Sequence, residues 1–120
     1  MFFSSNDTGQ KRDLALLRAV QLIFNANTNP SAYAKLGQPC FLRTLTNGLS
    51  KGNPLFAKKA ESISELEMSS ILRSRSNFDK RSIAQTLSAA FNETGYSPES
   101  KEALIKIAYD CDIPMNYFRI

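Results

Sequence analysis

The sequence predicts an all-α protein, a compact bundle of about six helices in a single domain. Prolines and glycines mark the expected helix boundaries: four of the five prolines fall at predicted starts and three of the five glycines at predicted ends. Between these boundaries apolar residues recur every three or four positions, and no segment alternates as a half-buried strand would. A chain of 120 residues with 42% hydrophobic residues can bury a substantial core.

The chain begins with a polar stretch followed by a strongly amphipathic one. Residues 1–12 include Gly9 and are expected to form a flexible arm or the frayed start of the first helix. A helix is predicted over residues 13–25, where an apolar stripe consists of Leu16, Leu17, Val20, Ile23 and Phe24.

Two short helices joined by a tight turn are predicted between residues 30 and 48. Asn29 can cap the first helix, and Gly37 can end it in the left-handed conformation. Pro39 then suits the start of the second helix, and Gly48 is expected to end it. Residues 13–68 would therefore form a helix-turn-helix core.

The second of these short helices has two different faces. One face is polar and contains Cys40, Arg43, Thr44 and Asn47. The opposite face is apolar and contains Phe41, Leu42 and Leu45. A helix that reads DNA needs this division, because Arg can pair with guanine and Asn with adenine in the major groove. Any surface helix also has a polar outer face, so the pattern alone leaves both interpretations open.

Three further helices are predicted towards the C-terminus. The first starts after Asn53, buries Phe56, Ala60, Ile63 and Leu66, and either continues through Leu72 or breaks near Ser69. The next covers residues 78–94, with Asn77 as its cap and Gly95 at its end.

The last predicted helix covers residues 98–110 and begins at Ser97 and Pro98. The tail 115–120 is rich in large apolar groups and is expected to pack onto the body or onto a partner. Residues 76–120 would complete the fold or provide a surface for dimerisation.

Charge is distributed unevenly along the chain. The net charge is +4, with +6 on residues 1–60 and −2 on residues 61–120. A basic half next to a mildly acidic half is typical of a phosphate-facing module joined to a packing module. Chance clustering on a solvated surface would give the same numbers.

Several classes of chemistry lack their residues. The chain has no His, which excludes Ser-His-Asp, Cys-His and Cys/His zinc sites, and no phosphate-binding glycine motif is present. We therefore expect neither enzyme activity nor a cofactor or metal. The two cysteines are far apart, and no signal peptide or membrane-spanning run is evident. We expect a soluble, cytoplasmic protein with reduced thiols.

The stretch from residue 30 to residue 63 resembles the helix-turn-helix of lambda-repressor-like transcriptional regulators. The matching features are a small residue and Leu36 on the first helix, Gly37 in the turn, Leu42 and Leu45 on the second helix, and Gly48. The resemblance implies that bases would be read by Gln38, Arg43, Thr44 and Asn47. It also implies phosphate contacts by Ser31, Lys35, Lys51 and Lys58.

These observations favour a small sequence-specific DNA-binding protein that regulates transcription and binds double-stranded DNA as a homodimer through its C-terminal helices. A different class remains open, namely a non-enzymatic helical protein–protein adaptor such as a secretion chaperone, an effector or an antitoxin-like protein. The aromatic residues Tyr117 and Phe118 of the tail support that alternative. Salt-sensitive binding to duplex DNA would separate the two.

Overall fold

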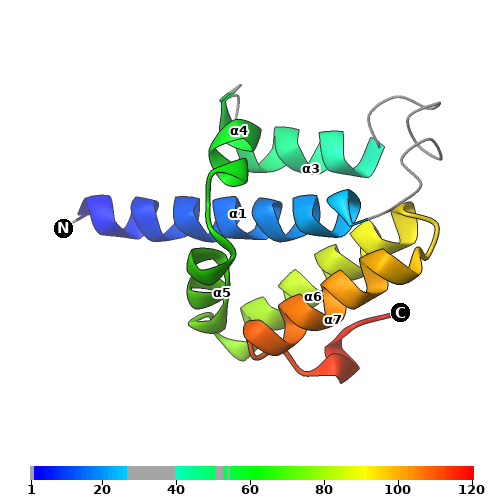
Figure 1. Cartoon of the computed structure of the whole chain (residues 1–120). Coiled ribbons are helices and arrows are strands. Elements are labelled where there is room, and N and C mark those ends of the chain that lie inside the picture. Colours follow the sequence, from blue (N-terminus) through cyan, green and yellow to red (C-terminus); the bar gives the residue numbers. More distant parts are fainter. Residues whose placement is uncertain (1, 27–39, 51–52, 54) are drawn as a thin grey trace.

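Figure 1 shows the computed structural model, in which the regular structure of the described residues is helical. The structure describes the backbone of residues 2–26, 40–50, 53 and 55–120, and the side chains of these residues except 2–8, 40–43 and 50. Within these ranges the elements are α1 (Phe2–Asn25), α3 (Cys40–Ser50), α4 (Phe56–Glu61), α5 (Glu65–Arg73), α6 (Asn77–Glu93), α7 (Pro98–Asp110) and the short 3-10 helix η1 (Met115–Tyr117). The predicted all-α bundle of about six helices is confirmed.

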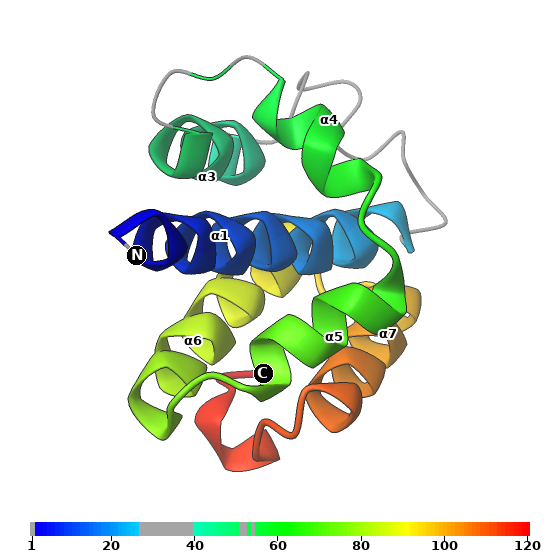
Figure 2. The same ribbon diagram turned by 90° about the vertical axis from the view of Figure 1, so that its left-hand side faces the viewer.

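Helix α1 is the central element of the bundle. Figures 1 and 2 show α3 and α4 on one side of α1 and α5, α6 and α7 on the other, and α1 contacts all five. The middle of α1 is apolar around most of its circumference, which is expected of a helix covered on both sides. Its buried residues are Ala15, Leu16, Leu17, Ala19, Val20, Ile23 and Phe24.

The flexible arm expected over residues 1–12 is not what the structure shows. Helix α1 already begins at Phe2 and continues through Gly9 without a break, ending at Asn25 as predicted. A glycine within a helix weakens it by roughly 0.5–1 kcal/mol relative to alanine. The burial of the following turns against five other helices outweighs that local preference.

The core consists of two groups of buried residues. The larger group lies between α1 and the layer of α5, α6 and α7, and the smaller group, Leu17, Phe56 and Ala60, lies between α1 and α4. The predicted core positions of α6 and α7 are buried, among them Ile83, Leu87, Leu104 and Ile107. Leu66 was expected to be buried but is exposed.

The exposure of Leu66 follows from a break that the sequence prediction placed elsewhere. The helix that starts near Phe56 ends at Glu61, and a new helix, α5, begins at Glu65. Ser64 caps α5, because its Oγ accepts a hydrogen bond of 3.1 Å from the backbone N–H of Glu67. Neither a break near Ser69 nor a helix continuous to Leu72 occurs.

The other helix boundaries within the described residues agree with the sequence prediction to within two residues. Ser76, rather than Asn77, caps α6, and Gly95 follows its end with a φ of +76°. Helix α3 continues past Gly48 to Ser50, whereas Ser97 and Pro98 start α7 as predicted. The tail packs onto the body: η1 contacts α6, and Phe118 is buried.

Candidate nucleic-acid interface

Helix α3 lies on the outside of the bundle, against one side of α1 (Figure 2). Its half-buried residues Leu45 and Leu49 pack against both groups of core residues. Thr44 and Asn47 are exposed on the same helix, as is Gly48. The described part of α3 therefore has an apolar side towards α1 and a polar side towards solvent.

Two polar side chains of α1 hold α4 in place beside α3. Gln21 donates from Nε2 to the carbonyl oxygen of Ala57 at 3.0 Å, and Arg18 donates from Nε to the carbonyl oxygen of Ile63 at 3.0 Å. These bonds connect α1 to one backbone carbonyl within α4 and to one just beyond its end. Sequence reasoning counted Arg18 only as part of the basic half and did not identify Gln21.

Helix α4 presents positive charge next to α3. Lys58 and Lys59 occupy its last turn, and both are exposed. Neither forms an ion pair with another residue that the structure describes. The adjacent lysine Lys59 was not among the predicted phosphate contacts, although its position one residue after Lys58 would have suggested it.

The structure describes only part of the predicted recognition site. It places Thr44 and Asn47 on the exposed side of α3 and Lys58 on the neighbouring helix α4. Arg43 belongs to α3, but its side chain lies outside the described residues. Also outside them are the other predicted contacts Ser31, Lys35, Gln38 and Lys51, together with the whole first helix of the predicted helix-turn-helix.

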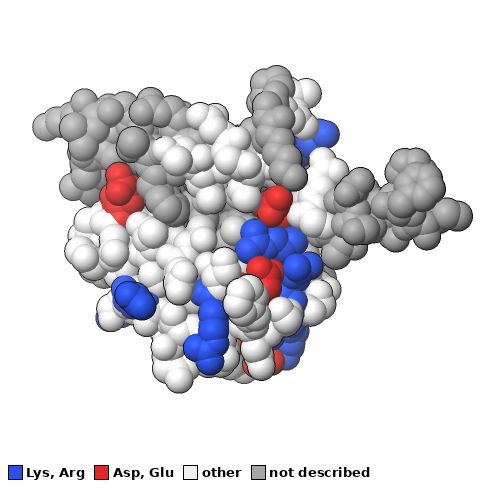
Figure 3. Space-filling view, turned by 180° about the vertical axis from the view of Figure 1, so that it is seen from behind, with Lys and Arg blue, Asp and Glu red and all other residues white. Residues whose placement is uncertain are grey.

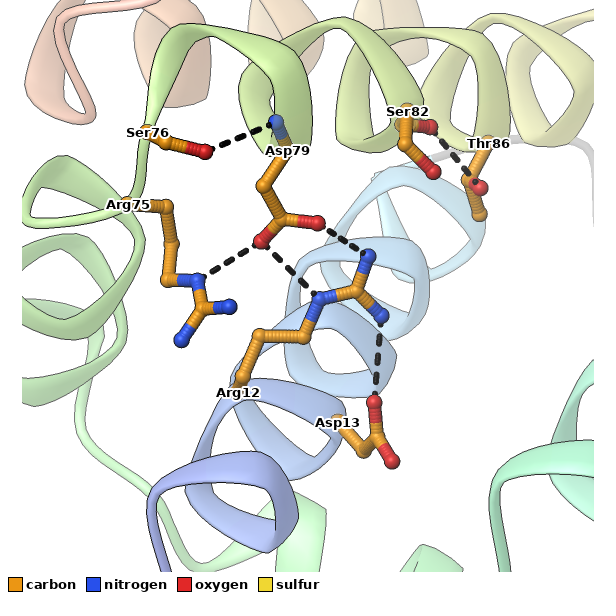
Figure 4. Close-up of polar contacts among 7 residues, drawn as sticks. All are labelled: Arg12, Asp13, Arg75, Ser76, Asp79, Ser82 and Thr86. Carbon is orange, nitrogen blue, oxygen red and sulfur yellow. Dashed lines mark hydrogen bonds and ion pairs between the residues drawn. The ribbon is translucent and has the colours of Figure 1, made fainter. Parts of the chain in front are cut away.

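Part of the positive charge of the N-terminal half is used inside the molecule. Figure 4 shows Arg12 between two carboxylates: its Nη2 lies 2.9 Å from Asp79 Oδ1, and its Nη1 lies 3.1 Å from Asp13 Oδ1. Arg75 completes this network with a distance of 2.7 Å from its Nε to Asp79 Oδ2. Arg12 therefore joins α1 to the first turn of α6 and is not available as a phosphate contact.

The same network sets the protonation of its members. Partial burial alone would raise the pKa of Asp79, but hydrogen bonds from Arg12 and Arg75 and their positive charges outweigh it, so this pKa lies below its usual value of 3.8.

On the face drawn in Figure 3, basic and acidic atoms adjoin one another and do not form a continuous positive surface.

Cys111, whose side chain the structure describes, is buried. Burial and the neighbouring Asp110 raise the pKa of the Cys111 thiol to about 12, so this thiol is protonated at neutral pH and is a poor nucleophile. Among the residues that the structure describes, no group of three or more His, Cys, Asp or Glu side chains is placed to hold a metal ion. None of the described helices combines the length and apolar character needed to cross a membrane.

Comparisons with models of protein families, with curated proteins and with solved structures found no match to this chain.

Proposed function

We propose that this chain is a cytoplasmic, sequence-specific DNA-binding protein that regulates transcription, with α3 as the helix that enters the major groove. One observation carries the proposal: Thr44 and Asn47 are exposed on the outer side of α3, and the adjoining helix α4 exposes two lysines. These lysines have no ion-pair partner among the described residues. Such a surface offers hydrogen-bonding groups for base edges next to charges for phosphates.

The dimensions and chemistry of α3 suit this role. Its 11 residues correspond to a rod about 16 Å long, and a major groove about 12 Å wide admits an α-helix. Asn47 can form two hydrogen bonds with adenine, and Thr44 can contact the methyl group of thymine. Lys58 and Lys59 would position the helix by contacts with the backbone phosphates beside the groove.

The proposal predicts binding that falls steeply with salt, which fluorescence anisotropy with a labelled duplex of random sequence can measure. The double variant Lys58→Ala/Lys59→Ala should bind more weakly and lower the slope of log K against log salt by about 2, since each phosphate contact contributes about one unit. The matched control is Lys101→Ala/Arg119→Ala, which removes the same charge from exposed positions in α7 and in the C-terminal tail, on the opposite side of α1.

Equal effects of the two double variants would contradict the proposed surface. If the unmodified chain does not bind duplex DNA even at low salt, the proposal is wrong, and the protein–protein adaptor becomes the better interpretation. That second class is favoured by a different observation, the exposed apolar residues of the layer formed by α5, α6 and α7.

The proposed recognition of the base sequence by Asn47 can be tested separately, once a preferred duplex has been selected. Asn47→Ala should reduce the preference for that duplex over random DNA by roughly 1–3 kcal/mol, because it removes a contact to a base edge. Lys58→Ala should weaken binding to both duplexes alike. If the two variants change specific and random binding in the same proportion, the assigned roles are wrong.

A further inference from the structure

A groove is lined by residues of α5 and α7. Both helices lie on the side of α1 away from α3 (Figures 1 and 2). The volume of the groove is about 930 Å³, and residues 112–115, which follow α7, also line it. Four of its lining side chains are large, apolar and exposed, with exposed fractions of 81% for Leu66, 42% for Ile105, 84% for Tyr109 and 44% for Met115. None of these residues has a role in the proposed DNA contact.

The exposed apolar area of these four side chains can be compared with what an interface requires. With about 200 Å² for a fully exposed aromatic side chain and about 100 Å² for an aliphatic one, the four side chains expose roughly 350 Å². A standard interface buries about 800 Å² on each partner, of which about 60% is non-polar, or roughly 480 Å². These side chains therefore supply most of the apolar area that one half of a stable interface requires.

We infer that this groove is the contact surface between two copies of the chain, related by a two-fold axis. In such a contact each patch meets itself, so it must contain both protrusions and a depression. The groove meets this condition, because Leu66 and Tyr109 project from the two helices that form its walls. In the dimer, Tyr109 of one copy fills the groove of the other.

The charges around the groove are also compatible with contact between identical patches. A patch of a single sign would repel its own copy, whereas this one combines Arg73 and Lys106 with Glu65, Asp110 and Asp112. Lys106 Nζ already lies 3.7 Å from Glu65 Oε1. Arg73 and Asp110 form no ion pair with a described residue of their own chain, so each can pair with the other across the two-fold axis.

This inference differs from the sequence-based expectation of a dimer through residues 76–120, because one wall of the groove is α5. It does not depend on DNA binding, since the groove and α3 lie on different sides of α1. Failure of one proposal in its own assay therefore leaves the other standing.

The mass of the full chain in solution, measured by light scattering over a range of concentrations, tests the inference. We expect a species of twice the 13.4 kDa chain mass with a dissociation constant in the micromolar range or tighter. Tyr109→Asp should shift this species to the monomer, because it places a charge in the apolar groove of the other copy. The matched control is Phe78→Asp, which changes an aromatic residue that is 86% exposed but does not line the groove, and it should leave the dimer unchanged.

Exchanging the charges of Arg73 and Asp110 tests whether these side chains pair across the two-fold axis or only support the fold of one chain. Arg73→Asp and Asp110→Arg should each raise the dimer dissociation constant at least several-fold, and the variant with both changes should recover the affinity. Circular dichroism should show unchanged helix content in every variant. A monomeric wild type, a Tyr109→Asp dimer as tight as wild type, or equal loss of the dimer in Phe78→Asp would each overturn the inference.

Discussion

Asp79 holds together three segments of the chain. Its carboxylate accepts hydrogen bonds from Arg12 in α1 and from Arg75 just before α6, and its own backbone N–H donates to the cap residue Ser76 (Figure 4). The side chains of Asp79 and Arg12 are 17% and 16% exposed, so solvent screens this pair less than a surface ion pair. Removing either partner leaves the other charge only partly compensated.

The variant Asp79→Asn should lower the free energy of unfolding at neutral pH by roughly 1–3 kcal/mol, since it removes a charge that two arginines contact. The pKa of Asp79 is lowered in the folded protein, so the stability that it contributes is present above its usual pKa of 3.8 and is lost as the pH falls through the folded value. Urea unfolding at neutral and acidic pH should therefore show a larger acid-induced loss in wild type than in Asp79→Asn.

Glu93→Gln is the matched control for that measurement. Glu93 is exposed at the end of the same helix, has no ion-pair partner among the described residues, and its substitution should change stability by less than about 0.5 kcal/mol. Parallel pH profiles for Asp79→Asn and wild type would contradict the role assigned to the network.

Asp112 adopts a backbone conformation that usually belongs to glycine. It follows α7 with a φ of +55°, donates from its N–H to the carbonyl of Tyr109, and lets the N–H of Ile113 reach the carbonyl of Ala108 at 2.9 Å. This pair of bonds ends the helix in a Schellman arrangement. The buried Lys80 donates to the Asp112 carbonyl at 3.0 Å, which adds a positive charge where the helix dipole favours one.

Asp112→Gly should therefore raise the free energy of unfolding by about 0.5–1 kcal/mol, because glycine adopts the left-handed backbone conformation without strain. The hydrogen bond from Lys80 should remain, because its acceptor is the backbone carbonyl of residue 112. The loss of the exposed carboxylate, 4.0 Å from Lys80 Nζ, should offset little of this gain. Thermal unfolding is the measurement.

The control is Glu102→Gly, within the exposed part of α7, which should instead lower the free energy of unfolding by about 0.5–1 kcal/mol. A lower stability of Asp112→Gly would show that the carboxylate matters more than the backbone.

Among the α-helices, α4 and α5 are the two shortest that the structure describes. Six residues of α4 and nine of α5 are too few for helices that are stable in isolation, so burial against α1 and good end groups must sustain them. Ser64 provides the end group for α5, and Arg18 from α1 binds the carbonyl of Ile63 in the same linker. The break between the helices is thus fixed by two specific hydrogen bonds.

Ser64→Ala should lower the free energy of unfolding by about 1 kcal/mol, the usual effect of removing an N-cap side chain. Chemical denaturation would measure it, with Ser70→Ala as the control, because Ser70 is exposed within α5 and alanine is the better helix former. Equal stability of Ser64→Ala and wild type would mean that packing against α1 alone fixes the break.

These helices also show what the sequence could and could not predict. Helix α7 was predicted at both ends, because Ser97 with Pro98 is a strong start signal and the apolar stripe continues without interruption to the last turn. The break at Ser64 was missed, because the apolar spacing of Phe56, Ala60, Ile63 and Leu66 continues across it. Helical periodicity does not reveal which member of a stripe remains exposed when a short linker turns the chain.

Residue type likewise did not reveal the partners of the charged groups. The excess of lysine and arginine in residues 1–60 includes Lys58, which is exposed, but it also includes Arg12 and Arg18. Those two arginines contact Asp79 and the carbonyl of Ile63, which are 67 and 45 residues away in sequence. Only the fold brings such groups together, so a count of charges does not show which of them are engaged inside the molecule.

At the scale of the whole molecule, α1 separates two surfaces of different chemistry. The layer of α3 and α4 exposes polar and basic side chains, whereas α5 and α7 form a groove with exposed apolar side chains. A protein that binds DNA as a dimer needs both kinds of surface, and they must not overlap. The same central helix supports both, since it packs against every other α-helix that the structure describes.

Titration of the isotope-labelled protein with duplex DNA, followed through its backbone amide NMR signals at low salt, tests the central claim most directly. We expect the largest shifts within Cys40–Ser50 and Phe56–Glu61, with the signals of Pro98–Asp110 nearly unchanged. Shifts confined to α5 and α7, or no shifts at any DNA concentration, would contradict the assignment of α3 and α4 as a DNA-binding surface.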